Sequence, residues 1–134
     1  MDDEQLIEAA KAARKNAHAP YSNYYVGAAL IDDRGETHSG CNVENAAYPE
    51  GNCAEANAIG AMVASGGKKI SVIAAVGGSD DLEFCTPCGG CRQSILEFSD
   101  DNTRVILLDE EGAIQKFSID ELLPLAFRLR QARL

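Results

Sequence analysis

Residues 24–44, YYVGAALIDDRGETHSGCNVE, decide the fold of this chain. The first part, 24–31, is apolar and has the composition of a strand, and it runs into a turn made of Asp32-Asp33-Arg34-Gly35. The segment 36–44 then predicts the returning strand. This hairpin predicts an antiparallel pair of strands within a larger sheet.

Regular elements flank the hairpin on both sides. Before it, apolar residues recur at helical spacing, Asp2 or Asp3 caps the start and Pro20 prevents continuation, which predicts a helix over 4–17. After it, a loop that ends near Asn52 leads into segments that alternate between helix formers and short apolar runs. These segments predict a helix over 54–64, a strand over 70–76, a helix over 89–98 and a strand over 104–108.

The end of the chain predicts a turn over 109–112 and a last helix. Ser118 and Glu121 form a capping-box pattern ahead of this helix, and Pro124 breaks or offsets it. Strands that alternate with helices after a hairpin predict a mixed sheet with helices on both faces. We therefore expect an α/β fold, a three-layer α/β/α sandwich, in a single domain over 1–134.

Composition and charge limit the classes of function. The chain has 134 residues, of which 21 are acidic and 12 basic, so its formal net charge is −9. Nucleic-acid binding is not expected, because Lys and Arg gather only in the last few positions. The chain opens with Met-Asp-Asp-Glu and has no long apolar run, which predicts a soluble, cytoplasmic protein without a membrane partner.

The cysteines indicate a metal site or a catalytic site. Five cysteines at uneven spacing do not suit a disulfide framework. Cys53 and Glu55 stand at the predicted start of one helix, and Cys88 and Cys91 at the start of another. Helix N-termini favour the thiolate, and a spacing of three directs Cys88 and Cys91 to one point. Residues two apart on a helix point about 200° apart, so Cys53 must lie at the cap to face the same site as Glu55.

Three cysteine ligands predict a catalytic zinc site rather than a structural one. They leave the fourth tetrahedral position open for water, and Glu55 stays free for proton transfer. Zinc deaminases share this arrangement, in which a histidine or cysteine ligand is followed two residues later by a glutamate and further on by Pro-Cys-x-x-Cys. Here the first ligand is a cysteine, which gives an all-thiolate site.

Three blocks of the sequence resemble the cytidine deaminase family, in particular its small, homotetrameric, zinc-dependent nucleoside deaminases. The blocks are YSNYYVGAA at 21–29, GCNVENAAY at 40–48 leading into CAE at 53–55, and PCGGCRQ at 87–93. Their order and spacing extend over 20–98. Glu121-Leu122-Leu123-Pro124 followed by Phe127 is similar to the family's C-terminal segment.

The resemblance implies a role for each site residue. Cys53, Cys88 and Cys91 would hold one Zn²⁺ per subunit, with Glu55 as the catalytic residue. Asn42 and Glu44 would bind the ribose hydroxyls, and Tyr24 would line the pyrimidine pocket. Phe127 would reach the site of a neighbouring subunit in a homotetramer whose sites lie near the interfaces. The implied substrate-binding residues are Tyr24, Asn42, Glu44, Tyr48, Ala54 and Phe127.

The expected reaction is hydrolysis of cytidine or deoxycytidine to uridine or deoxyuridine and ammonia, in pyrimidine salvage. Attack on the ring carbon that bears the amine needs hydroxide at neutral pH, and zinc lowers the pKa of bound water to about 7. Glu55 would accept the proton of the water, protonate the ring nitrogen and relay a proton to the departing ammonia.

Two features depart from the family pattern. Ala56 follows Glu55, where the family has an arginine. Zn²⁺ with three thiolates carries 2 − 3 = −1, and a guanidinium that hydrogen-bonds a sulfur would offset this charge, for which Arg92 is the candidate. The loop Pro49-Glu50-Gly51-Asn52 also differs from the small and hydroxyl residues expected beside the pocket. Either departure would change the rate or the substrate preference.

Other interpretations of the motifs stay open. Cys85-x-x-Cys88-x-x-Cys91 overlaps the start of a bacterial ferredoxin motif, but Ile95 occupies the position of the fourth cysteine. A zinc-stabilised nucleoside-binding protein without catalysis is a further alternative, against which the presence of Glu55 argues. Within the enzymes, the alternative substrate is another aminated heterocycle such as blasticidin S, and polynucleotide editing is disfavoured by the net charge of −9.

Overall fold

A computed structural model describes residues 1–129 of the chain as five strands and four helices with one short 3₁₀ turn. Arg130 and Arg133, two of the basic residues at the C-terminal end, lie outside this range. The strands are β1 Tyr25–Asp32, β2 Thr37–Cys41, β3 Ile70–Gly78, β4 Arg104–Leu108 and β5 Ile114–Ser118. The helices are α1 Asp3–Arg14, α2 Ala54–Ala64, α3 Gly89–Glu97 and α4 Ile119–Leu122, and the 3₁₀ turn is η1 Tyr48–Glu50.

The strands form one mixed sheet in the order β2-β1-β3-β4-β5. The predicted hairpin is present as the antiparallel pair of β1 and β2, in which Leu30 lies opposite His38. Strand β1 also pairs antiparallel with β3, whereas β3 and β4 run parallel with α3 between them in the chain. The expected mixed sheet is therefore confirmed.

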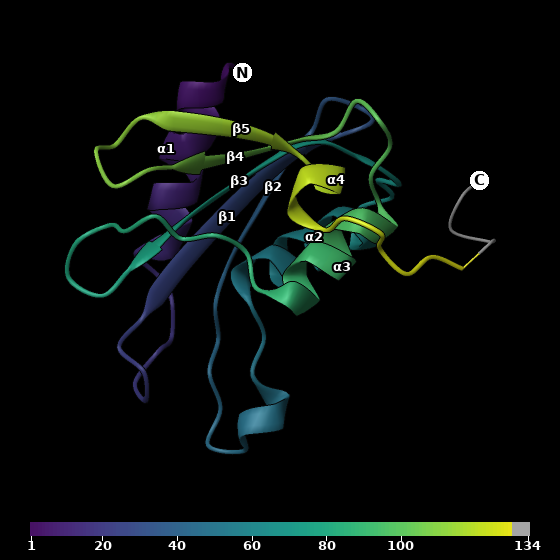
Figure 1. Ribbon diagram of the computed structural model, residues 1–134. Coiled ribbons are helices and arrows are strands. Elements are labelled where there is room, and N and C mark those ends of the chain that lie inside the picture. The colour runs from purple at the N-terminus through teal and green to yellow at the C-terminus, as the bar shows by residue number, and fades with distance from the viewer. Residues whose placement is uncertain (130–134) are drawn as a thin grey trace.

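Helices cover both faces of the sheet, so the fold is the expected α/β/α sandwich (Figure 1). Because successive side chains of a strand point to opposite faces, neighbouring residues enter different cores. Ala29 packs in the core beneath α1, and Ala28 and Leu30 pack in the core beneath α2, α3 and α4. Within residues 1–129, no helix combines the length and the apolar character that crossing a membrane requires.

Small residues let the helices approach the hairpin closely. A Cβ on Gly27 would lie 2.0 Å from the carbonyl oxygen of Ala10 in α1. On the neighbouring strand, a Cβ on Gly40 would lie 2.6 Å from the backbone nitrogen of Ala58 in α2. The absence of side chains at these two glycines therefore sets how near α1 and α2 sit to the sheet.

The structure corrects several predicted boundaries. The first helix ends at Arg14 rather than near residue 17, since the N–H of His18 already donates to the carbonyl oxygen of Asn42, at 3.0 Å. The returning strand ends at Cys41, and the chain then continues through single bridges at Val43. Strand β5 was not predicted, because it is a mostly polar edge strand that pairs only with β4. The capping box of Ser118 and Glu121 is confirmed.

Candidate active site

The N-termini of α2 and α3 bring three thiols together on one side of the sheet. Cys53 is the N-cap of α2 and has an extended backbone, as the spacing to Glu55 requires. Cys88 is the N-cap of α3, and Cys91 lies in its first turn. The sulfur atoms of Cys53, Cys88 and Cys91 all lie within 4.8 Å of one another, and none of the three forms a disulfide.

The surroundings of these groups shift their protonation in different directions. Burial raises the pKa of the Cys53 thiol and that of the Cys91 thiol. The backbone N–H of Cys91 donates a hydrogen bond to Cys88 and lowers the pKa of that thiol. Glu55 is only 4% exposed, and burial raises the pKa of its carboxyl group. Burial thus disfavours the charged forms of Cys53, Cys91 and Glu55, and a bound cation would offset this effect for the sulfurs.

The donor set fits zinc. Cysteine sulfur is a preferred ligand of Zn²⁺, and three such donors leave one of the four usual positions for a further ligand. Among the described residues, the group consists of the three cysteines without Glu55 and without Cys85. This composition does not match the ferredoxin alternative, because that motif needs Cys85 together with Cys88 and Cys91.

A cavity of about 260 Å³ lies beside the three sulfurs and holds most of the predicted substrate residues. Tyr24, Asn42, Glu44, Ala54 and Glu55 all line it together with the cysteines. No Lys or Arg is among the described residues that line it. Tertiary structure thus brings residues of the hairpin and of both helix N-termini to one opening.

Asn42 and Glu44 are held by the segment that leads into β1. The side-chain oxygen of Asn42 accepts from the backbone N–H of Val26 at 2.8 Å, and its Nδ2 donates to the carbonyl oxygen of Tyr24 at 2.8 Å. Oε1 of Glu44 accepts from the backbone N–H groups of Tyr21 and Ser22 at 3.0 and 3.1 Å. The Ser22 hydroxyl bonds the other oxygen and lowers the pKa of Glu44, which keeps this carboxylate ionised.

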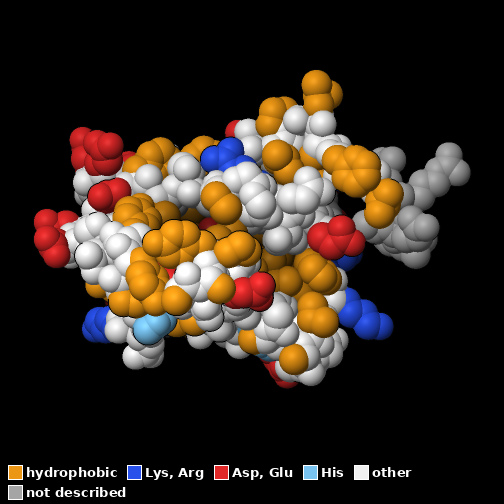
Figure 2. Space-filling view, turned by 90° about the horizontal axis from the view of Figure 1, so that it is seen from below, with side chains coloured by type: hydrophobic (Ala, Val, Ile, Leu, Met, Phe, Trp, Pro, Cys, Tyr) orange, Lys and Arg blue, Asp and Glu red, His pale blue; other side chains and the backbone are white. Residues whose placement is uncertain are grey.

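Tyr48 and Phe127 lie outside this cavity. Tyr48 is 76% exposed in η1 and stacks edge to face on Tyr21, with ring centroids 6.0 Å apart. Both tyrosines line a neighbouring cavity of about 350 Å³ that shares Ser22 and Glu44 with the first. Phe127 follows α4 and is 68% exposed. Figure 2 shows hydrophobic side chains gathered on the face where η1 lies.

Arg92 does not make the contact that was expected of it. Its guanidinium donates to the carbonyl oxygens of Pro87, at 2.7 Å, and Leu122, at 2.6 Å. The described hydrogen bonds of Arg92 therefore join the turn before Cys88 to α4, and none of them reaches a sulfur. Ala56, half-buried in α2, supplies no charge either.

Four lining residues of the cavity, Ser22, Val26, Cys85 and Thr86, were not predicted as site residues. Ser22 and Val26 belong to the block 21–29, so their position in that block was the available signal. Cys85 drew attention only through its spacing to Cys88, which suggests an iron–sulfur motif rather than a pocket wall. Its place in the cavity depends on how the loop after β3 returns to the sheet.

The fold and the site define an α/β metalloprotein with a three-thiolate zinc centre beside a buried carboxyl group. Residues 1–108 match the family described as "Cytidine and deoxycytidylate deaminase zinc-binding region". The chain belongs to this family.

Relatives of known activity and structure match over most of their length. The cytidine deaminase of Sporosarcina psychrophila is 42% identical over 127 residues, which cover 95% of this chain and 92% of that protein. The crystal structure of cytidine deaminase from Burkholderia pseudomallei superposes with a TM-score of 0.86 at 44% identity, covering 95% of this chain and 100% of the other. The blasticidin-S deaminase of Bacillus cereus is 32% identical over 132 residues, covering 92% of this chain and 93% of that protein.

Proposed function

We propose that this protein is a zinc-dependent cytidine deaminase, which hydrolyses cytidine, deoxycytidine or both to the corresponding uridine and ammonia in pyrimidine salvage. The observation that carries the proposal is the buried carboxyl group of Glu55 beside three clustered cysteine sulfurs, in a cavity that also contains Asn42 and Glu44. The similarity to curated cytidine deaminases over nearly the whole chain supports the same activity.

Cys53, Cys88 and Cys91 would hold the zinc ion. When bound, zinc acts as a Lewis acid that brings the pKa of a water molecule to about 7. The pKa of the Cys88 thiol is lower than its ordinary value, which favours the deprotonated form that binds a cation. The protein thus contributes its donors from two helix N-termini, where the helix dipoles favour negative charge.

Glu55 would transfer the protons of the reaction. One water adds to the ring carbon that bears the amine. One of its protons moves to the ring nitrogen, where the uridine product keeps it, and the other moves from the added hydroxyl to the amine, which leaves as ammonia. A single carboxyl group serves both steps, because it regains at the end the state in which it started. Burial suits this role, since it reduces the preference of Glu55 for the ionised form.

The residues around the rest of the cavity would bind a nucleoside. The Glu44 carboxylate would accept hydrogen bonds from ribose hydroxyls, and the Asn42 amide would also bind them, while Tyr24 and Ala54 line the cavity beside the base. The cavity has no described Lys or Arg to bind a phosphate group, which favours an uncharged nucleoside over a nucleotide. No feature of the cavity favours the alternative substrate blasticidin S, whose deaminase is the less similar relative.

We also propose that four copies of the chain, each a single domain, assemble into a homotetramer in the cytoplasm. Tyr48 and Phe127 are large apolar side chains that the single chain leaves exposed. Tyr48 lines the neighbouring cavity together with Glu44, and Phe127 is joined by a hydrogen bond to Gln93 of α3. An interface that buries them would also complete the site. Arg92 supports this arrangement by tying α4, which precedes Phe127, to the zinc-bearing helix.

The test is ammonia release from cytidine and deoxycytidine by the zinc-loaded protein, with Glu55→Gln as the blank. We expect turnover of at least one nucleoside and a loss of roughly 10²- to 10⁴-fold in the variant, the range that acid–base groups contribute. Turnover retained by Glu55→Gln would exclude the proton-transfer role. No turnover by the zinc-loaded wild-type protein would overturn the proposed substrate and direct the search to other aminated heterocycles.

A further inference from the structure

The loop between β3 and the zinc-bearing turn folds back onto the sheet. The backbone N–H of Glu83 donates to the carbonyl oxygen of Gly77 at 2.8 Å, and the two residues form an isolated antiparallel bridge. Arg14 of α1 fixes the other end of the loop, because Nη2 donates to the carbonyl oxygens of Gly78 and Ser79 at 2.7 and 2.9 Å. The position of Glu83 is therefore set by the sheet rather than by a free loop.

This return places the carboxylate of Glu83 against Tyr24. The hydroxyl of Tyr24 donates to Oε2 of Glu83 at 3.3 Å. Burial and then a hydrogen bond with Cys85 raise the pKa of Tyr24, and the negative charge of Glu83 adds to the effect. The phenol is protonated near neutral pH, as an ordinary tyrosine is, and can therefore donate to Glu83.

The backbone and the ring edge of Tyr24 are also supported. Nδ2 of Asn42 donates to the Tyr24 carbonyl oxygen at 2.8 Å, which fixes the main chain just before β1. Cys85 lies beside the phenol and packs on the backbone of β3, since a Cβ on Gly77 would come within 2.7 Å of its sulfur. The hydroxyl end of the ring thus depends on Glu83 and Cys85, whereas the backbone end depends on Asn42.

We propose that Glu83 is a positioning residue for the base pocket, whose carboxylate holds the hydroxyl of Tyr24 and so fixes the aromatic ring as a wall of the cavity. The inference rests on the proposed function, in which Tyr24 lines the pyrimidine pocket. Glu83 is not among the described residues that line the cavity, so it acts through the tyrosine. A ring that is fixed before the nucleoside binds loses less conformational freedom on binding. We therefore expect loss of Glu83 to weaken substrate binding rather than to slow the chemical step.

Steady-state kinetics with cytidine test this role. A single hydrogen bond of this kind corresponds to a roughly 2- to 10-fold rise in KM for Glu83→Ala, with kcat within about twofold of the wild-type value. Glu83→Gln keeps a side-chain oxygen as acceptor and restores most of the affinity. Tyr24→Phe removes the donor, so adding Glu83→Ala to Tyr24→Phe has no further effect.

Asp80→Ala is the matched control, because it removes one negative charge from the same exposed loop without a described side-chain contact. It should leave KM unchanged. An equal rise of KM in Asp80→Ala would assign the effect to loop charge and overturn the proposal. An unchanged KM in Glu83→Ala, or the same rise in the presence and absence of the Tyr24 hydroxyl, would also overturn it.

A measurement without turnover separates this proposal from the proposed function. In protein labelled with [¹³Cζ]tyrosine, the Tyr24 signal is assigned from its loss in Tyr24→Phe. We expect that signal to shift in Glu83→Ala and to stay near its wild-type position in Glu83→Gln. A signal unchanged in Glu83→Ala overturns the contact even if cytidine is deaminated. Absence of cytidine turnover together with the expected shift overturns only the proposed substrate.

Discussion

Glu44 combines two tasks that a substitution can separate. Its carboxylate accepts hydrogen bonds from the backbone N–H groups of Tyr21 and Ser22, and it also lines the cavity, where it can accept from a ligand. We expect Glu44→Ala to reduce kcat/KM for cytidine by roughly 10- to 100-fold, because hydrogen bonds to a charged group are the stronger ones. Free cytosine, which has no ribose, should lose much less. Assays of both substrates with Glu44→Ala and Glu44→Gln measure this, and equal losses on the two would exclude ribose recognition.

Cys88 links metal binding to stability. Its thiol has the lowered pKa of the three, so its removal takes away the donor that is most readily deprotonated. Cys88→Ala should lose most of its zinc and unfold at a lower temperature than the wild-type protein, since binding free energy adds to folding free energy. Cys41→Ala is the control, because Cys41 lies in β2 away from the three sulfurs. Full zinc content in Cys88→Ala, by metal analysis, would show that the ligand set is wrong.

The sequence predicts the central part of the site well and its surroundings less well. Cys53, Glu55, Cys88 and Cys91 could be predicted because cap positions and spacings of two and three are local properties of a helix start. The contacts of Arg92 could not, because one acceptor, the carbonyl oxygen of Leu122, is 30 positions away in the chain. A residue's local motif indicates that it is at the site, whereas its partner depends on tertiary packing.

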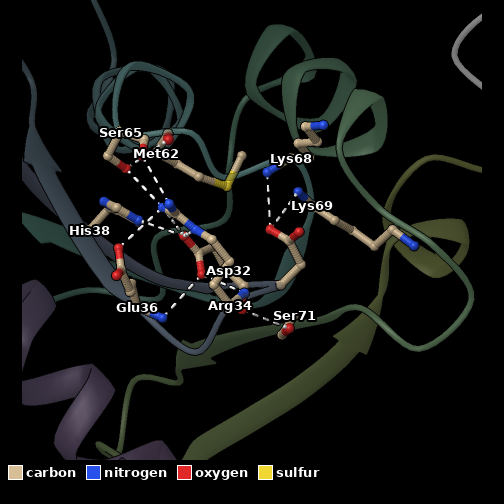
Figure 3. Close-up of polar contacts among 10 residues, drawn as sticks. Asp32, Arg34, Glu36, His38, Met62, Ser65, Lys68, Lys69 and Ser71 are labelled. Atoms are coloured by element: carbon tan, nitrogen blue, oxygen red, sulfur yellow. Dashed lines mark hydrogen bonds and ion pairs between the residues drawn. The ribbon is translucent and has the colours of Figure 1, made fainter.

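At the scale of elements, an ion-pair network around the buried Asp32 joins the β1–β2 turn to the far end of α2 (Figure 3). Asp32 is only 1% exposed, and its Oδ2 lies 2.9 Å from Nη2 of Arg34 and 2.8 Å from Nε2 of His38. Arg34 also donates to the carbonyl oxygen of Ser65, the C-cap of α2, at 2.9 Å. The network fixes the end of α2 opposite to Cys53. Asp32, Glu36 and His38 also have the donor atoms of a possible metal site. The guanidinium of Arg34, however, pairs with both carboxylates and already supplies a positive charge there.

This network makes stability depend on pH in a defined direction. Burial raises the pKa of Asp32, but hydrogen bonds from His38, Arg34 and two backbone N–H groups outweigh it and hold the pKa well below its usual range. A carboxyl group whose pKa is lowered on folding stabilises the protein above its unfolded pKa, about 3.9, and this contribution disappears as the pH falls toward the folded pKa. Asp32→Asn should therefore melt on the order of 10 °C below the wild-type protein at pH 7.

The difference in melting temperature between Asp32→Asn and the wild-type protein should shrink below about pH 4. Thermal unfolding followed by circular dichroism between pH 7 and pH 3 measures it. Asp101→Asn, at an exposed position without a described contact, serves as the control and should follow the wild-type curve. A difference that is constant over this pH range would contradict the ionised state of Asp32.

The elements that were predicted correctly have signals within their own sequence. Strand β4 is a short apolar run, and α2 begins after its cap and ends before a glycine pair, so their bounds agree with the prediction. Strand β5 lacks such a signal, because Gln115 and Lys116 are suited to an edge and its pairing depends on β4. Extended backbone that is defined only by its neighbour cannot be predicted from its own composition.

At the scale of the whole molecule, the single chain leaves large apolar side chains exposed near its site. Tyr48, in η1, is 76% exposed, and Phe127, in the segment after α4, is 68% exposed. Gln93 of α3 donates to the carbonyl oxygen of Phe127 at 2.9 Å, so the segment after α4 has a fixed exit direction. The proposed tetramer, in which Phe127 would complete a neighbouring site, would account for this exposure.

Mixing Glu55→Gln with Phe127→Ala tests whether Phe127 serves a neighbouring subunit. Glu55→Gln lacks the proton-transfer group but has Phe127, whereas Phe127→Ala lacks the aromatic side chain but has Glu55. If Phe127 acts on a neighbour, random reassembly of equal amounts gives about a quarter of the sites both groups, and activity rises above that of either variant alone. If Phe127 acts on its own subunit's site, every subunit still lacks one group and mixing gives no gain. Native mass spectrometry of the mixture shows whether subunits have exchanged, because Phe127→Ala lowers the mass of its subunit, and this makes a missing gain decisive.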